Sequence, residues 1–175
     1  AFLQYGFSGN LPQQIRAQEG RVLSRWGDAG WGRLVADNKR ADHFDDELVV
    51  AMAEMIQQRW QPNPAPQWVC CVPSRNHVQL VARRLAACLG LPFFDAISKV
   101  RDNQPQKGQQ NRFHQCRNLD GAFEINQPLP NTPVLLVDDI VDSGWTLTVI
   151  AALLQRAGSG KVYPVALASS SVKDS

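Results

Sequence analysis

The sequence has 175 residues, of which 44% are hydrophobic and 19% charged, and its formal net charge is +2. A chain of this length can bury about 70% of the surface that its unfolded form exposes, which is enough for one compact domain. The total charge gives no reason to expect nucleic-acid or membrane-surface binding. Because the sequence has neither a run of about 18 apolar residues nor a basic-then-apolar leader, a membrane span and a secretion signal are unsupported, and we expect a cytoplasmic protein.

Residues 1–40 are rich in Gln, Gly and Arg, and we expect them to form an extension, hood or linker ahead of a domain at residues 41–175. A strand or a short helix fits residues 21–25, and a turn-rich stretch with Trp26 and Trp31 follows. The two tryptophans either dock this segment on the core or face a preceding domain. The chain does not begin with Met, so its first residue is expected to be a processed end or a cut within a longer chain.

A helix is expected between residues 42 and 60, where apolar side chains recur at helical spacing and Asp42 or Asp45 can cap the first turn. A proline-rich connector follows it. The apolar run Trp68–Val72 is then typical of a buried strand. The four cysteines include no Cys-x-x-Cys pair, and we expect them to be reduced thiols that lie mostly in the core.

Strand, polar turn and helix follow one another in this part of the chain. Residues 73–77 form the turn, in which His77 is interpreted as a helix-start residue rather than a catalytic base. The apolar spacing of residues 78–89 predicts a helix that Gly90 ends, and residues 91–94 begin another strand. Such units predict an α/β fold with an open, mainly parallel sheet of about five strands, helices on both faces, and ligands at the C-terminal ends of the strands.

A long polar stretch at residues 102–118 lacks hydrophobic periodicity, as a mobile lid would. Residues 75–117 contain eight Lys or Arg against two acids, whereas residues 134–143 contain three acids and no base. This separation of charge suits a polyphosphate held with a metal between the two segments. A basic solvated loop is the alternative.

Residues 134–147 carry most of the functional signal. Four aliphatic residues typical of a buried strand are followed by Asp138, Asp139, two apolar residues and Asp142-Ser-Gly-Trp-Thr146 at the start of a helix. Such a turn brings backbone N–H groups, hydroxyls and the positive end of the helix dipole together, and it therefore forms a cradle for a phosphate. The adjacent acids would repel the phosphate unless they hold sugar hydroxyls or a hydrated cation.

Three other interpretations of this segment are less favoured. A receiver domain also ends a strand in two acids, but it carries them near its N-terminus. A P-loop requires Gly-x-x-x-x-Gly-Lys-Ser/Thr, which the sequence lacks. A buried strand with a solvated acidic turn would need neither three acids nor the Ser-Gly-x-Thr turn.

The segment resembles the diphosphoribose-binding signature of type I phosphoribosyltransferases. The resemblance implies that Asp138 and Asp139 bind the ribose hydroxyls of phosphoribosyl pyrophosphate, directly or through water and Mg²⁺. It also implies that residues 142–146 hold the 5′-phosphate. Ser143 replaces the usual Thr and keeps the hydroxyl, whereas Trp145 stands where a small or polar residue is commoner, so its ring must point away from the phosphate. The implied phosphate contacts are Ser143, Gly144, Trp145 and Thr146.

The resemblance spans about Trp68 to Ala168 and points to proteins related to the competence protein ComF. The segment before it resembles the region ahead of the phosphoribosyltransferase-like domain appended to some RecQ-type DNA helicases. In the resembling family the loop after the first strand grips pyrophosphate, although Ser and Asn there also make ordinary helix caps. The pyrophosphate contacts implied for this chain, lid cations included, are Ser74, Arg75, Asn76, Lys99, Arg101 and Lys107.

The implied activity is transfer of phosphoribose to a purine-type base, with release of pyrophosphate and with Mg²⁺ as cofactor. The ligand would be phosphoribosyl pyrophosphate or a nucleoside monophosphate. Asp142 is expected to face the base and exchange its proton, with a simple helix cap as the alternative role. Two rival functions stay open: a non-catalytic phosphoribosyl-pyrophosphate-binding or regulatory module attached to a DNA helicase or DNA-uptake system, and a structural adaptor. A homodimer is also considered, and no membrane partner is expected.

Overall fold

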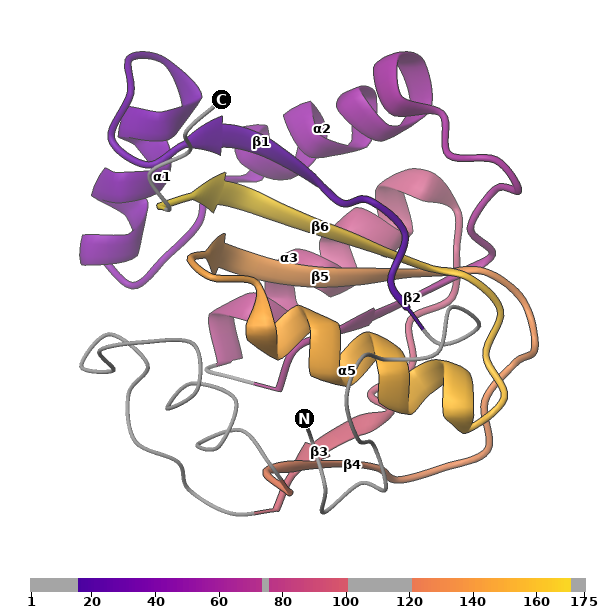
Figure 1. Ribbon diagram of the computed structural model, residues 1–175. Helices are drawn as coiled ribbons and strands as arrows, with labels where there is room; N and C mark the ends of the chain where they lie inside the picture. The colour runs from indigo at the N-terminus through magenta and orange to yellow at the C-terminus, as the bar shows by residue number, and fades with distance from the viewer. Residues whose placement is uncertain (1–15, 74–75, 101–120, 171–175) are drawn as a thin grey trace.

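The computed structural model describes residues 16–73, 76–100 and 121–170. Its centre is a four-stranded, wholly parallel sheet in the order β1-β6-β5-β2, accompanied by a two-stranded antiparallel sheet (Figure 1). The strands are β1 (Arg21–Arg25), β2 (Trp68–Cys71), β3 (Ile97–Lys99), β4 (Phe123–Ile125), β5 (Val134–Val141) and β6 (Val162–Ser169). The helices are α1 (Trp31–Arg40), α2 (Asp46–Glu54), the π-helix η3 (Met55–Trp60), α3 (Asn76–Leu89) and α5 (Trp145–Arg156).

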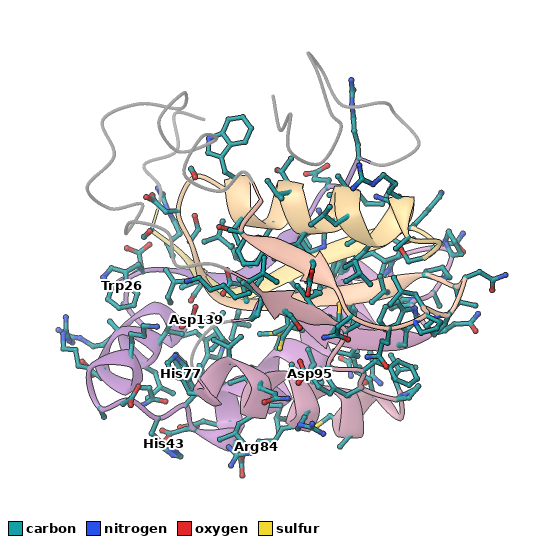
Figure 2. The ribbon with its side chains drawn as sticks, turned by 90° about the horizontal axis from the view of Figure 1, so that it is seen from below. Trp26, His43, His77, Arg84, Asp95 and Asp139 are labelled. Atoms are coloured by element: carbon teal, nitrogen blue, oxygen red, sulfur yellow. The ribbon has the colours of Figure 1, made fainter. Side chains whose placement is uncertain are left out.

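The central sheet is buried on both faces, which explains the unbroken aliphatic run at the start of β5. Leu135 and Val137 belong to the hydrophobic cluster that includes α1, α2 and α3, whereas Val134 and Leu136 belong to the cluster on the α5 side. Figure 2 shows α5 on one side of the sheet and the purple and pink helices on the other. The predicted α/β fold with helices on both faces is therefore confirmed. No helix in the described ranges is long and apolar enough to cross a membrane.

The sheet extends beyond β2 by a single bridge rather than by a full fifth strand. Val69 forms an isolated parallel bridge with Phe93. The Val69 N–H donates to the Pro92 carbonyl at 2.9 Å, and the Phe94 N–H donates to the Val69 carbonyl at 3.0 Å. The strand predicted to begin at residue 91 is thus reduced to one bridged residue beside β2.

The first 40 residues contribute to the same sheet. Residues 21–25 form a strand, not a short helix, and β1 pairs in parallel with β6 from Arg21 opposite Val165 to Arg25 opposite Ser169. Helix α1 then follows and packs its buried Val35 into the cluster shared with α2 and α3. The domain boundary expected at residue 40 stays a prediction, but β1 is hydrogen-bonded to the rest of the sheet.

The helix expected between residues 42 and 60 changes its hydrogen bonding along its length. Asp45, in an extended conformation, occupies the N-cap of α2, whereas Asp42 has a left-handed backbone with φ of 58°. From Met55 the helix continues as the π-helix η3 and ends at Trp60, where the prediction placed its end. Leu48, Met52 and Ile56 share one hydrophobic cluster with Leu135 and Val137 of β5, so this long helical segment helps to cover one face of the sheet.

Gly32 allows α1 to approach the end of β1. A Cβ added at Gly32 would lie 1.9 Å from the Arg25 carbonyl oxygen. We expect Gly32→Ala to lower the free energy of unfolding by about 1–3 kcal/mol in urea denaturation, because the backbone must shift to admit the methyl group. Helix propensity alone would favour Ala by about 1 kcal/mol, so the sign of the change identifies the close contact.

Arg33→Ala is the matched control for this substitution. Arg33 is exposed on the same helix, and its truncation should change the free energy of unfolding by less than about 0.5 kcal/mol. A Gly32→Ala variant as stable as the wild type would show that α1 does not approach β1 as closely as the structure has it.

Candidate functional site

A cavity of about 660 Å³ lies at the edge of the sheet where β5 and β6 end. Parallel pairing brings the C-terminal ends of β1, β5 and β6 to this one edge, and Figure 1 shows their arrowheads pointing to the side where α1 lies. The cavity brings together six residues that the sequence had marked as a site: Asp138, Asp139, Asp142, Ser143, Gly144 and Thr146. Other lining residues include Trp26 directly after β1, Lys39 in the last turn of α1, and Ser170 after β6.

The remaining predicted site residues lie elsewhere or outside the described ranges. Trp145 is not part of the cavity lining and packs against the hydrophobic cluster on the α5 side. Lys99 ends β3 in the two-stranded sheet and does not line the cavity either. Asn76 begins α3. Four predicted residues lie outside the described part of the chain: Ser74, Arg75, Arg101 and Lys107.

The turn between β5 and α5 has the form of an anion-binding helix start. Gly144, the N-cap of α5, has φ of 83°, a left-handed conformation that glycine adopts without strain. The Trp145 N–H donates to the Ser143 hydroxyl oxygen at 3.4 Å, and the Thr148 hydroxyl donates to the Gly144 carbonyl at 3.0 Å. The N-terminal end of α5 lines the cavity. The positive end of the helix dipole at this point favours a bound anion.

Asp139 is the most strongly held carboxylate of the site. Its Oδ1 accepts from the Ile140 N–H at 2.7 Å. Its Oδ2 accepts from the Lys39 ammonium and lies 3.2 Å from His77 Nε2. The neighbouring carboxylate is held differently, since Asp138 Oδ1 accepts from the Asp139 N–H at 2.8 Å. Both oxygens of Asp139 thus accept hydrogen bonds within this chain, and Oδ1, which accepts from one backbone N–H, keeps a further acceptor position.

His77, in the first turn of α3, joins Asp139 to a second carboxylate. Its Nδ1 lies 3.2 Å from Asp42 Oδ1, and its Nε2 also lies 3.3 Å from Lys39 Nζ. The imidazole is buried and packs against the Phe44 ring, with 5.4 Å between centroids. Figure 2 shows His77 and Asp139 together on the same side of the molecule. His77 starts a helix as predicted, and it also contacts a site carboxylate.

Burial and neighbouring charges shift the pKa values of the two adjacent acids in opposite directions. Burial raises the pKa of Asp138 well above its usual value, and the negative charge of Asp139 raises it further. Burial also acts to raise the pKa of Asp139, but the hydrogen bonds from Lys39 and Asp138 outweigh it and lower that pKa. Asp139 is therefore the firm anion of the pair.

The donor set suits Mg²⁺ only as a hydrated ion shared with a substrate. Mg²⁺ prefers oxygen ligands, keeps several waters and commonly binds through one or two carboxylates plus substrate phosphates. Asp138 lines the cavity and can provide one such carboxylate, whereas the oxygens of Asp139 are engaged. Across residues 16–73, 76–100 and 121–170 no group of three or more His, Cys, Asp or Glu could form a metal cage.

Sequence reasoning missed Lys39, Asp42 and Trp26, and it gave His77 no part in the site. One signal was available for Lys39, which follows the buried Val35 by four residues and so lies on the inward face of a helix. That signal can be used only if a helix is predicted at residues 31–40. No helix was predicted there, because the preceding stretch is rich in glycine. The contact of His77 with Asp139 joins residues 62 positions apart and has no local signature.

Comparisons with known proteins agree with this architecture. The profile of the phosphoribosyl transferase domain family matches residues 46–173. DNA utilization protein YhgH of Salmonella typhi is 31% identical over 132 residues, which are 66% of this chain and 58% of that protein. YhgH of Escherichia coli (strain K12) is 34% identical over 68 residues, 39% of this chain and 30% of that protein.

Among solved structures, a purine phosphoribosyltransferase from Pyrococcus horikoshii has 21% sequence identity, a TM-score of 0.47, and coverage of 71% of this chain and 72% of that one. The family profile, which matches residues 46–173, shows by itself that the chain belongs to the phosphoribosyl transferase domain family. This match confirms the resemblance to phosphoribosyltransferases that the sequence predicted. It spans less than two thirds of the length of the curated relatives that it matches.

Gly144 gives a direct test of the turn. A Cβ at Gly144 would meet no atom within 4 Å, so the cost of a substitution comes from its left-handed backbone alone. We expect Gly144→Ala to lower the free energy of unfolding by about 1 kcal/mol in urea denaturation. Gly144→Asn should cost less, because Asn enters the left-handed region more readily. Equal stability of the Ala variant and the wild type would contradict this turn geometry.

Proposed function

We propose that this domain binds phosphoribosyl pyrophosphate or a nucleoside monophosphate at the cavity, and that it transfers the phosphoribosyl group to a purine-type base with release of pyrophosphate. One observation carries the proposal: a carboxylate pair, a third acid and the N-terminus of α5 line a single cavity of about 660 Å³. Anion-binding groups and diol-binding carboxylates are therefore adjacent, as a sugar phosphate requires.

The binding roles follow from the chemistry of each group. The N-terminus of α5, with the hydroxyls of Ser143 and Thr146, would receive the 5′-phosphate, because backbone N–H groups and the helix dipole favour an anion there. The Asp138 and Asp139 carboxylates would accept hydrogen bonds from the ribose hydroxyls. The Trp145 N–H, which donates to the Ser143 hydroxyl at 3.4 Å, would be shared with the phosphate, whereas the Trp145 side chain packs away on the hydrophobic cluster.

Transfer breaks the ribose C1–O bond through an oxocarbenium-like state, so positive charge develops on the ribose while negative charge develops on pyrophosphate. The firm anion Asp139 would stabilise the ribose side, and groups fixed before the reaction act most strongly. When bound through water to Asp138, Mg²⁺ would supply a compact positive charge near the pyrophosphate. Arg75, Arg101 and Lys107 stay the proposed cations for the leaving group, whereas Lys99 ends β3 outside the cavity lining.

Asp142 is the proposed proton-exchange group for the acceptor base. Its carboxylate is exposed and lines the same cavity, two residues before the N-cap of α5. An exposed carboxylate beside a bound sugar can reach a ring nitrogen of the base without first being desolvated. This assignment gives the three acids distinct tasks: two for the ribose and one for the base.

A second function has its own support. The curated relatives are named DNA utilization proteins, and the Lys39 ammonium beside Asp139 partly offsets the negative charge that would stabilise an oxocarbenium-like state. The alternative is a phosphoribosyl-pyrophosphate-binding regulatory module, with a DNA helicase or a second copy of this chain as its partner. It shares the binding site with the catalytic proposal and differs from it only in lacking group transfer.

Turnover separates the two functions. We expect incubation with labelled phosphoribosyl pyrophosphate, Mg²⁺ and a panel of purine and pyrimidine bases to release pyrophosphate with a purine. Asp142→Asn should then lower the turnover number by about 10²-fold or more, the range for loss of general acid–base catalysis. A loss of tenfold or less would reject this role for Asp142. Binding without pyrophosphate release for any base would favour the regulatory module.

Binding tests the ribose contacts independently of turnover. Calorimetry with phosphoribosyl pyrophosphate and Mg²⁺ should show at least about tenfold weaker affinity for Asp139→Asn, because a hydrogen bond to a charged group is worth about 1.5–3 kcal/mol. Asp46→Asn is the matched control, since this exposed residue of α2 pairs with Arg84 away from the cavity. Unchanged affinity of the Asp139 variant would contradict the ribose assignment.

A further inference from the structure

Lys39 brings a positive charge into the site from a part of the chain that the family profile does not cover. It lies in the last turn of α1, whereas the profile begins at residue 46. The Lys39 side chain is about one-third exposed, lines the cavity, and donates to Asp139 Oδ2. Its position is set by α1, which the close approach of Gly32 to the end of β1 holds in place.

The oxygens of Asp139 leave little room for a metal ion. Oδ1 accepts from the Ile140 N–H, and Oδ2 accepts from Lys39 with His77 Nε2 beside it at 3.2 Å. The Asp139 side chain is only 9% exposed, so an incoming cation would have to displace the ammonium group of Lys39 to reach Oδ2. A divalent ion would also be repelled by that ammonium over a few ångströms, where the interaction is strong.

We propose that Lys39 is a built-in counter-ion of Asp139, which positions this carboxylate for a sugar hydroxyl and excludes divalent cations from it. Lys39 is thus a positioning and specificity-determining residue of the sugar-phosphate site, and this role rests on the proposed function. Any hydrated Mg²⁺ is confined to Asp138 and to the diphosphate of the substrate. A sugar phosphate that lacks a diphosphate, such as ribose 5-phosphate, therefore binds without a divalent ion.

The first test measures metal binding without any sugar phosphate. Mn²⁺ takes oxygen ligands, and its free-ion electron paramagnetic resonance signal falls on binding. Removal of the positive charge in Lys39→Ala and Lys39→Gln should tighten Mn²⁺ binding at least about tenfold. Lys39→Arg keeps the charge and should match the wild type. Lys161→Ala, an exposed lysine just before β6 and outside the cavity lining, is the matched control and should also match.

The manganese titration has a clear opposing outcome. Mn²⁺ affinities of Lys39→Ala and Lys39→Gln within about twofold of the wild type would overturn the proposal, and so would a Lys39→Arg variant that binds as tightly as Lys39→Ala. An ion pair that serves stability alone would change the melting temperature without this dependence on charge. Thermal melting therefore accompanies each titration, and two uncharged variants are used so that one can replace the other if it does not fold.

The second test uses the wild-type chain. Calorimetry with ribose 5-phosphate should give the same affinity, within about twofold, in EDTA and in Mg²⁺. Tightening by more than about tenfold in Mg²⁺ would overturn the role of Lys39 even if no variant folds. Absence of ribose 5-phosphate binding in both conditions would instead count against the proposed function, and the manganese titration would then decide the role of Lys39 by itself.

Discussion

The buried position of β5 is the constraint on which the site depends. This strand pairs in parallel with both β2 and β6, and its first four residues are completely buried between helices on the two faces. The strand reaches the cavity only in its C-terminal half, where Asp138 and Asp139 line it. Parallel pairing then places the ends of β1 and β6 at the same edge, so residues far apart in the sequence converge there.

Two adjacent acids at a largely buried strand end are costly, because burial and mutual repulsion both oppose ionisation. The fold gives the two carboxylates different hydrogen-bond partners. Lys39 and His77 satisfy Asp139, and Asp42 in turn lies beside His77, whereas Asp138 accepts a backbone hydrogen bond and keeps its high pKa. The two carboxylates are neighbours in sequence, but Asp139 ionises more readily than Asp138, so the two groups differ in what they can do for a ligand.

Features encoded by residues close together in the sequence could be predicted, whereas contacts between distant residues could not. The strand, acids and turn of residues 134–147 form one contiguous unit, so the pattern of aliphatics, acids and Ser-Gly-x-Thr predicted the fold class and six cavity residues together. The contacts of Lys39 and His77 with Asp139 arise from tertiary packing across 100 and 62 positions. The strand predicted to begin at residue 91 is longer than the single bridge that the structure has at Phe93. Strand pairing there depends on the neighbouring backbone of β2, which the local apolar run does not reveal.

The role of β1 and α1 also bears on where the functional unit begins. The family profile starts at residue 46, yet β6 pairs with β1 along one side and Lys39 of α1 contacts Asp139. Without β1, the eight-residue and almost wholly buried β6 would become an exposed edge strand, which invites pairing with other chains. Without α1, Asp139 would lose its cation while staying buried, a costly state for a carboxylate. Residues 21–40 are therefore needed both by the sheet and by the electrostatics of the cavity, although the family profile does not include them.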